Sequence, residues 1–346
     1  MSRVIVIGGG QSGIAAAQAL LERGARPLVL ESGPKATGSW PHYYDSLTLF
    51  TPAWFNALPG APLPGDPNRY PTGAEVADYL RSRAESLDCE IRTGHRVTSV
   101  TSDPAGFLVR TEHGAELTGT AVVAATGIFG NPHRPELPAL DGYTGVVRHS
   151  ADYRSPEPFA GQRVVVVGAG NSAVQIAVEL AEHAEVTLAT RKPIQYATNQ
   201  PIPGDSRFWS VLSAAARLPL GPLLGHGTIP VVDIAGYKAA IDAGKPDRRE
   251  MFVAAEGTSL RWPDGTAEHV DAVILATGYR PALDYLRPLG VLDEAGRPRQ
   301  RHGISHTHPG LTFVGLEHQR SILSGTMHGC GRDARHVARR LTPSRS

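Results

Sequence analysis

The chain has 346 residues, of which 41% are hydrophobic and 19% charged, and its formal net charge at pH 7 is +1. This composition excludes a disordered chain, favours two domains, and leaves no basic surface that would make nucleic acid the expected partner. The apolar runs fall short of the roughly 18 residues that a membrane-spanning helix needs, so we expect neither membrane insertion nor a signal peptide. Because Cys89 and Cys330 are the two cysteines and no CxxC motif occurs, we expect a cytoplasmic enzyme without a redox disulfide.

The first apolar segment, VIVIGGGQSGIAAAQAL, predicts a strand, a glycine turn and a helix. It contains the fingerprint Gly8-x-Gly10-x-x-Gly13, in which the glycines permit a tight turn, a close approach of a pyrophosphate and packing of helix on strand. Glu31 lies 18 residues after Gly13, at the end of the second predicted strand, where a carboxylate can accept hydrogen bonds from ribose hydroxyls. The alternative is a structural glycine turn with a surface glutamate.

The sequence VVVVGAGNSAVQIAVEL repeats this pattern about 160 residues later. Its fingerprint, Gly168-x-Gly170-x-x-Ala173, is followed at the matching offset by Arg191 and then Lys192. A guanidinium group binds a 2′-phosphate through charge-assisted hydrogen bonds, whereas a carboxylate repels it. The first unit therefore predicts FAD and the second NADPH, with a solvated basic pair as the alternative interpretation of Arg191 and Lys192.

Two further segments match each other, VVAATGIFG at residues 122–130 and VILATGYRP at 273–281. Each indicates a buried strand that stops at a Thr-Gly turn, a little over 100 residues after its own fingerprint. The sequence thus predicts two Rossmann-type units. Between these landmarks we expect short strands over 89–122 and helices at 73–87, near 206–217, near 233–243 and at 323–341.

The combination of motifs resembles the two-dinucleotide-binding flavoproteins and, within them, the flavin-containing monooxygenase group, in its compact bacterial branch. Tyr143-x-Gly145-x-x-x-His149-x-x-x-Tyr153 is similar to the group's FxGxxxHxxx(W/F/Y) signature, with tyrosine in the leading position. The segments GSWPHYYDSLTLFTP and GLTFVGLEHQRSILSGTMHGCGRDA resemble its flavin-contacting loop and its C-terminal flavin-cradling stretch. The resemblance covers nearly the whole chain.

The resemblance implies an α/β fold of two Rossmann-like domains, with the NADPH domain inserted into the FAD domain. We expect residues 1–155 and 280–346 to build the FAD-binding domain and 156–279 the NADPH-binding domain. The candidate cofactor-binding residues are Gly8, Gly10, Gln11, Ser12, Gly13, Glu31, Ser39, Trp40, Val97, Thr126, Gly127, Gly168, Gly170, Asn171, Ser172, Ala173, Arg191, Lys192, Thr277, Gly278, Gly315 and Gln319.

The implied function is an FAD-dependent, NADPH-using monooxygenase that inserts one oxygen atom from O₂ into a small organic substrate through a C4a-(hydro)peroxyflavin. The cofactor carries the chemistry, so no catalytic side chain is assigned. His149 has two interpretations, a proton-transferring base or a structural hinge residue. The segment 192–250, with Phe208, Trp209 and His226, is expected to line or cover the pocket.

One departure from the group bears on function. Phe50 aligns with the asparagine that supports the oxygenated flavin in many members, and phenylalanine cannot donate a hydrogen bond. An NADPH oxidase or reductase that passes electrons onward without oxygenation therefore stays open, as does a non-catalytic flavin redox sensor. The histidines 302, 306 and 308 have spacing that could supply metal ligands, but they lie in a predicted loop, so we expect no metal site.

Overall fold

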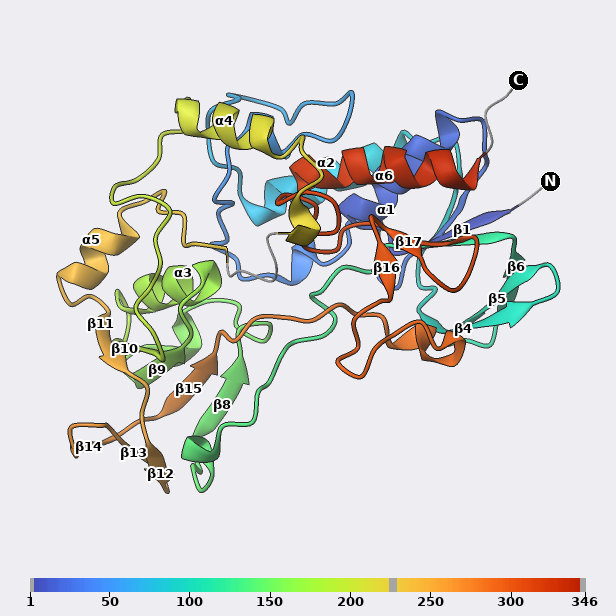
Figure 1. The fold of residues 1–346 in the computed structure, drawn as a ribbon. Helices are drawn as coiled ribbons and strands as arrows, with labels where there is room; N and C mark the ends of the chain where they lie inside the picture. Colours follow the sequence, from blue (N-terminus) through green and yellow to red (C-terminus); the bar gives the residue numbers. More distant parts are fainter. Residues whose placement is uncertain (1–2, 224–228, 343–346) are drawn as a thin grey trace.

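The first sheet has a parallel centre built around the N-terminal βαβ unit (Figure 1). The computed structural model describes residues 3–223 and 229–342. All four side chains of β1 are buried, as are the three of β2, because both strands are covered on both faces. The strands, in sheet order, are β16 (Gln300–Arg301), β17 (Ile304–Ser305), β18 (Leu311–Phe313), β7 (Ala121–Ala124), β1 (Val4–Ile7), β2 (Leu28–Leu30) and β3 (Glu90–Arg92).

The second sheet repeats this arrangement in the second half of the chain. All of its strand pairings are parallel. The strands, in sheet order, are β11 (Asp247–Glu250), β10 (Glu185–Thr190), β9 (Arg163–Val167), β15 (Ala272–Leu275) and β8 (Val146–His149). The helix α3 (Asn171–Leu180) packs against β9 and β10, the strands before and after it in the chain. The two sheets with their helices confirm the predicted α/β fold of two Rossmann-like units.

Each unit also has a separate three-stranded antiparallel sheet. In chain order it follows an edge strand of the parallel sheet (β3 or β11) and precedes the strand that ends in Thr-Gly (β7 or β15). In the first unit these strands are β4 (Val97–Asp103), β5 (Gly106–Thr111) and β6 (Glu116–Gly119). In the second they are β12 (Ala254–Glu256), β13 (Ser259–Arg261) and β14 (Ala267–His269). The internal repeat therefore extends beyond the fingerprints to the connection that leads back into each sheet.

The predicted helices occur, with shorter bounds that follow their caps. The Thr326 side chain accepts a hydrogen bond from the Gly329 amide, which sets the start of the C-terminal helix. Thr72 and Glu75 form a reciprocal capping box at another helix start. The α-helices are α1 (Gln11–Leu21), α2 (Gly73–Glu85), α4 (Arg207–Ala215), α5 (Tyr237–Asp242) and α6 (Met327–Leu341). Short 3₁₀ helices are η1 (Trp40–His42), η2 (Ala53–Asn56), η3 (Pro138–Leu140), η4 (Glu157–Phe159), η5 (Gly221–Leu223) and η6 (Asp284–Leu289).

The chain passes between the sheets twice, from β7 to β8 and from β15 back to β16 (Figure 1). β8 pairs with β15 in the second sheet, although it precedes residue 156, at which the sequence places the start of the second domain. The sheet thus takes up a strand from before that boundary, and the domain limits stay a prediction.

Of the described residues in the segment 192–250, Ile229 lines the main cavity, but the expectation that Phe208 and Trp209 line it is wrong. Trp209 is fully buried in a core cluster with Phe55, and its indole Nε1 donates to the Pro203 carbonyl at 3.1 Å. Neither Phe208 nor Trp209 borders the main cavity described below. His226, the third residue of that prediction, lies outside the described residues. Within residues 3–223 and 229–342, no helix has the length and apolar character needed to cross a membrane.

Candidate functional site

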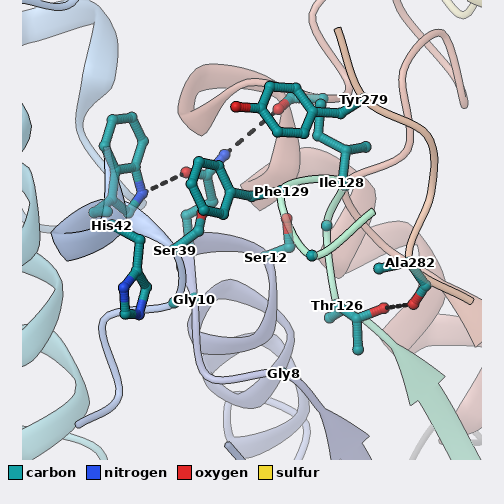
Figure 2. Close-up of a pocket in the computed structure, with 18 of the residues that line it drawn as sticks. Gly8, Gly10, Ser12, Ser39, His42, Thr126, Ile128, Phe129, Tyr279 and Ala282 are labelled. Atoms are coloured by element: carbon teal, nitrogen blue, oxygen red, sulfur yellow. Dashed lines mark hydrogen bonds between the residues drawn. The ribbon is translucent and has the colours of Figure 1, made fainter. Parts of the chain in front are cut away.

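The main cavity lies between the two units and has a volume of about 810 Å³, within the range of roughly 300–1,000 Å³ that is typical of small-molecule sites (Figure 2). The first unit contributes most of its wall, and the second contributes Asn171, Ser172, Ile229 and Tyr279. Of the sequence-predicted residues, those that line it are Gly8, Gly10, Gln11, Ser12, Glu31, Ser39, Trp40, Val97, Thr126, Gly127, Asn171, Ser172 and Gly315.

The turn between β1 and α1 is shaped by close backbone contacts. Gly8 has φ +108°, and a Cβ there would lie 2.5 Å from the Ala125 carbonyl oxygen. A Cβ on Gly13 would overlap the Gly8 carbonyl, so the third glycine packs helix against strand and does not line the cavity. These contacts leave the backbone of the turn and the first N–H groups of α1 facing the cavity, which is the arrangement that binds a pyrophosphate.

Glu31 follows β2 and is 5% exposed. Its Oε2 accepts a hydrogen bond from the Gly9 amide at 2.6 Å, and its Oε1 accepts bonds from the Gly33 amide at 2.6 Å and the Ser32 hydroxyl at 3.1 Å. An ionised carboxylate has about four acceptor positions. The three bonds therefore orient the carboxylate and leave capacity to accept from a ribose hydroxyl of a dinucleotide in the cavity.

A chain of hydrogen bonds joins three segments of the wall (Figure 2). The Trp40 indole donates to Gln11 Oε1 at 3.0 Å, and Gln11 Nε2 donates to the Gly325 carbonyl at 3.4 Å. On the opposite wall, Thr126 donates to the Ala282 carbonyl at 2.7 Å. Predicted residues from α1, the 38–40 loop and the first Thr-Gly turn are thus brought to one site.

Gln319 does not contact the cavity, contrary to the sequence-based expectation. Its side chain is buried, donates to the Phe313 carbonyl at 2.8 Å and accepts from the Leu316 amide at 3.3 Å, so it closes the turn after β18. The neighbouring His318 does line the cavity, and its Nδ1 is buried without a hydrogen-bond partner among the residues that the structure describes.

The second fingerprint has the same geometry as the first. Gly168 has φ +149°, and a Cβ there would lie 2.5 Å from the Ala276 carbonyl oxygen. A Cβ on Gly170 would meet no atom within 4 Å, so the space beside this residue can admit a coenzyme. Of the other predicted residues, Ala173 is buried against the glycine turn, and Thr277 donates to the His133 carbonyl at 2.5 Å. None of these four, nor Gly278, lines the main cavity.

Arg191 and Lys192 are exposed and follow directly after β10, as their spacing from the fingerprint predicts. A third cation, missed by the sequence reasoning, stands on the adjacent strand β11. The Arg248 guanidinium donates to the Thr190 hydroxyl at 2.8 and 3.1 Å. Three basic side chains therefore lie at or beside the end of β10. Arg248 could not be predicted from local sequence, because only the pairing of β10 with β11 brings it to this place.

His149 is 0% exposed, and both of its ring nitrogens are used within the protein. Nδ1 accepts from the Ala151 amide at 3.0 Å and Nε2 donates to the Gly278 carbonyl at 3.1 Å, which describes a neutral ring. Burial is the largest cause of a lowered pKa of His149. The ring joins β8 to the second Thr-Gly turn, and this geometry favours the hinge interpretation over a proton-transferring base.

Aromatic rings that the sequence reasoning missed connect the two units. Phe129 follows the first Thr-Gly turn and Tyr279 follows the second, and their rings stack with centroids 5.3 Å apart (Figure 2). Tyr43 packs against Phe129 at 4.5 Å. The signal was present, since each ATG motif is followed within three residues by an aromatic residue, but no local rule says that the two rings meet.

Phe50 lines the cavity beside two polar residues that satisfy each other. The Thr51 hydroxyl donates to Asn56 Oδ1 at 2.9 Å, and Asn56 Nδ2 donates to the Thr51 and Pro52 carbonyls at 2.8 and 3.0 Å. This part of the wall therefore presents no free side-chain hydrogen-bond donor. Among the described residues, no group of three or more His, Cys, Asp and Glu side chains could hold a metal ion.

Comparison with known proteins supports this architecture. A family model described as pyridine nucleotide-disulphide oxidoreductase matches residues 5–204. A CzcO-like oxidoreductase of Geobacillus kaustophilus is 33% identical, with 96% of each chain covered. Indole-3-pyruvate monooxygenase YUCCA1 of Oryza sativa subsp. japonica is 29% identical over 97% of this chain and 90% of that protein. The solved structure of a flavin-containing monooxygenase from Stenotrophomonas maltophilia superimposes with a TM-score of 0.87 at 31% identity and 99% coverage of both chains.

Gly10→Val tests the assignment of FAD to the first fingerprint. The branched side chain would enter the cavity beside Gly38, whose Cα lies 3.2 Å from a Cβ at this position. We expect folded but colourless protein, measured by flavin absorbance and circular dichroism. Gly170→Val is the matched control, because its Cβ meets no atom, and it should keep its flavin. Full flavin occupancy in Gly10→Val would show that the assignment is wrong.

His149→Ala separates the hinge from the base. The change leaves the Gly278 carbonyl and the Ala151 amide unpaired, so stability should fall by about 1–3 kcal/mol. NADPH oxidation per bound flavin should fall by less than about tenfold, whereas loss of a general base costs about 10²–10⁴-fold.

The lowered pKa of His149 means that its neutral ring adds stability above the unfolded pKa near 6.5 and loses it as the pH falls. The difference in stability between the wild type and His149→Ala should therefore shrink below about pH 6.5, as measured by thermal unfolding at several pH values. A large rate loss with unchanged stability would instead support the base.

Proposed function

The chain belongs to the pyridine nucleotide-disulphide oxidoreductase family, and we propose that it is a flavin-dependent monooxygenase that transfers one oxygen atom from O₂ to a small organic substrate. It is an oxidoreductase whose cofactors are FAD and NADPH. The observation that carries the proposal is the cavity of about 810 Å³ between the units, walled by the first fingerprint and closed by residues of the second.

The residues present fit FAD in this cavity. The glycine turn and the start of α1 would bind the pyrophosphate, and Glu31 would accept from the adenosine ribose. Bound flavin, once reduced by NADPH, would supply the activation of O₂, from which the transferred oxygen atom comes. The protein's part is to orient the reactants and keep water out, for which Phe50, Phe129 and Tyr279 provide apolar wall.

The second unit would hold NADPH. Gly168 and Gly170 leave room for its pyrophosphate, and Arg191 with Lys192 would bind the 2′-phosphate. Asn171 and Ser172 line the main cavity from the start of α3, so a coenzyme at this fingerprint would lie next to it. We propose that residues 1–155 and 280–346 form the FAD-binding domain and 156–279 the NADPH-binding domain. β8 lies within residues 1–155 but pairs with β15 in the sheet of the NADPH-binding domain.

Disulfide chemistry, which the family name includes, is not proposed for this chain. Neither cysteine lines the cavity, and Cys330 is fully buried in α6. Burial raises the pKa of the Cys330 thiol to about 12 and that of Cys89 to about 11, so both side chains are held in the unreactive thiol form.

One observation favours a second candidate, an NADPH oxidase. Phe50 and the mutually bonded pair Thr51 and Asn56 leave no free donor on their part of the wall. Such a wall stabilises an oxygen adduct poorly, so electrons would pass to O₂ and leave as H₂O₂.

Labelled oxygen decides between the two candidates. The flavin-loaded enzyme is incubated with NADPH and ¹⁸O₂ in the presence of a panel of small ketones and thioethers. For the monooxygenase we expect a product that carries one ¹⁸O atom for each NADPH consumed, as measured by mass spectrometry. H₂O₂ equal to the NADPH consumed, with no labelled product from any compound, would establish the oxidase instead.

Arg191→Ala tests the choice of coenzyme. A charge-assisted hydrogen bond to phosphate contributes about 1.5–3 kcal/mol, or a factor of about 10–150 in affinity. We expect the wild type to prefer NADPH over NADH by at least about tenfold in kcat/KM. The variant should lose most of that preference through a higher KM for NADPH, with NADH use nearly unchanged.

Arg261→Ala is the matched control, because Arg261 is exposed on β13 and away from the fingerprint. It should keep the preference, and both variants should keep normal flavin content. Equal use of the two coenzymes by the wild type would leave Arg191 as a surface charge.

A further inference from the structure

A second cavity, of about 340 Å³, lies between the C-terminal end of α4 and the side of α6. It shares no lining residue with the main cavity. The residues that line it are Ala216, Arg217, Leu218, Pro219, Arg320, Ser321, Arg332 and Asp333. Nothing in the proposed oxygenation uses this cavity.

The wall of this cavity carries excess positive charge. Three of its eight residues are arginines, and Asp333 is the one acidic residue, so the lining keeps a net charge of +2 even with that carboxyl ionised. Arg320 and Asp333 form an ion pair in this wall. Arg320 Nη1 lies 3.5 Å from Asp333 Oδ1, at the outer limit of a hydrogen bond. Arg217 and Arg332 form no ion pair within the described residues.

Two polar atoms of this wall are buried without a hydrogen-bond partner in residues 3–223 and 229–342. Arg332 Nη1 has no acceptor there, and Asp333 Oδ2, on a residue that is 1% exposed, has no donor. Buried polar atoms are rarely left unpaired, and an unpaired buried charge is destabilising. Burial, and then the positive charge of Arg217, lower the pKa of the Arg332 guanidinium. In the described residues, Arg332 Nη1 thus lacks an acceptor, and its guanidinium lies near a second positive charge.

We propose that this cavity binds a small multivalent oxyanion of the phosphate or polycarboxylate class between the guanidinium groups of Arg217, Arg320 and Arg332. Guanidinium groups match the geometry of such oxyanions through paired N–H donors, and Arg332 Nη1 gains its missing acceptor. Asp333 is no obstacle, because the lining keeps its net charge of +2 with this carboxyl ionised. Burial raises the pKa of Asp333 to about 6, so an anion beside it would favour the protonated carboxyl, which can donate to the anion.

Calorimetric titration of the FAD-loaded enzyme with sodium phosphate tests the proposal, with chloride balancing the ionic strength. We expect one binding site per chain in the wild type. Arg332→Gln should weaken phosphate binding at least tenfold, and Arg217→Gln, a change of an exposed residue, should weaken it several-fold. Arg339→Gln is the matched control, because it removes an exposed arginine of α6 outside the cavity, and it should bind as the wild type does.

Further measurements separate this site from the coenzyme site and from a structural role. Arg191→Ala should retain the phosphate isotherm, because its guanidinium belongs to the proposed 2′-phosphate site. Without phosphate, Arg332→Gln should not lower the melting temperature, since it removes a charge that repels its neighbours. Phosphate should raise the melting temperature of the wild type and of Arg339→Gln, but much less that of Arg332→Gln. A citrate titration identifies the class, as tighter binding of citrate than of phosphate indicates a polycarboxylate.

The proposal is overturned by three outcomes. They are no binding of either anion, equal loss in Arg339→Gln and Arg332→Gln, and loss of phosphate binding in Arg191→Ala. Each can occur whether or not the enzyme oxygenates a substrate, so this test is independent of the proposed function.

Discussion

The structure depends on one close contact that occurs twice. In each unit the first glycine of the fingerprint has a left-handed backbone and packs against the carbonyl of the strand that ends in Thr-Gly, so that a Cβ would stand 2.5 Å from the Ala125 oxygen at Gly8 and from the Ala276 oxygen at Gly168. In each sheet, this contact fixes the distance between the strand that leads into the fingerprint (β1 or β9) and the strand that ends in Thr-Gly (β7 or β15), at the point where both end. The helix start, the Thr-Gly turn and the residue after the second strand then converge on one place, where a dinucleotide can lie.

The two copies differ at the residue that follows their second strand. Glu31 is buried and held by three hydrogen bonds, whereas Arg191 at the matching position is exposed. A pre-oriented, buried acceptor suits a group that stays bound through many turnovers. An exposed cation suits a coenzyme that must enter and leave once in each cycle. On the proposed assignment, the same backbone turn would hold a resident FAD in the first unit and an exchanging NADPH in the second.

Local sequence patterns predicted what local chemistry determines. The fingerprints, the Thr-Gly strands and the residues that follow the second strands were all placed correctly, because each feature is set within about twenty residues. The membership of β8 in the second sheet, the stacking of Phe129 on Tyr279 and the burial of Trp209 were not predicted, because each depends on segments far apart in the chain. Gln319 was also misplaced, although the contacts that hold it are local. A glutamine side chain can bind a ligand or close a turn, and the neighbouring residues do not indicate which of the two it does.

The double passage of the chain between the sheets has a consequence for synthesis on the ribosome. α1 packs against α6, and β7 pairs with β18, so the N-terminal unit is completed by residues made about 190–330 positions later. The inserted unit, by contrast, has all of its strands once β15 has emerged. We therefore expect residues 146–275 to fold first, while the apolar faces of β1 and α1 stay exposed to chaperones until β18 and α6 have been synthesised.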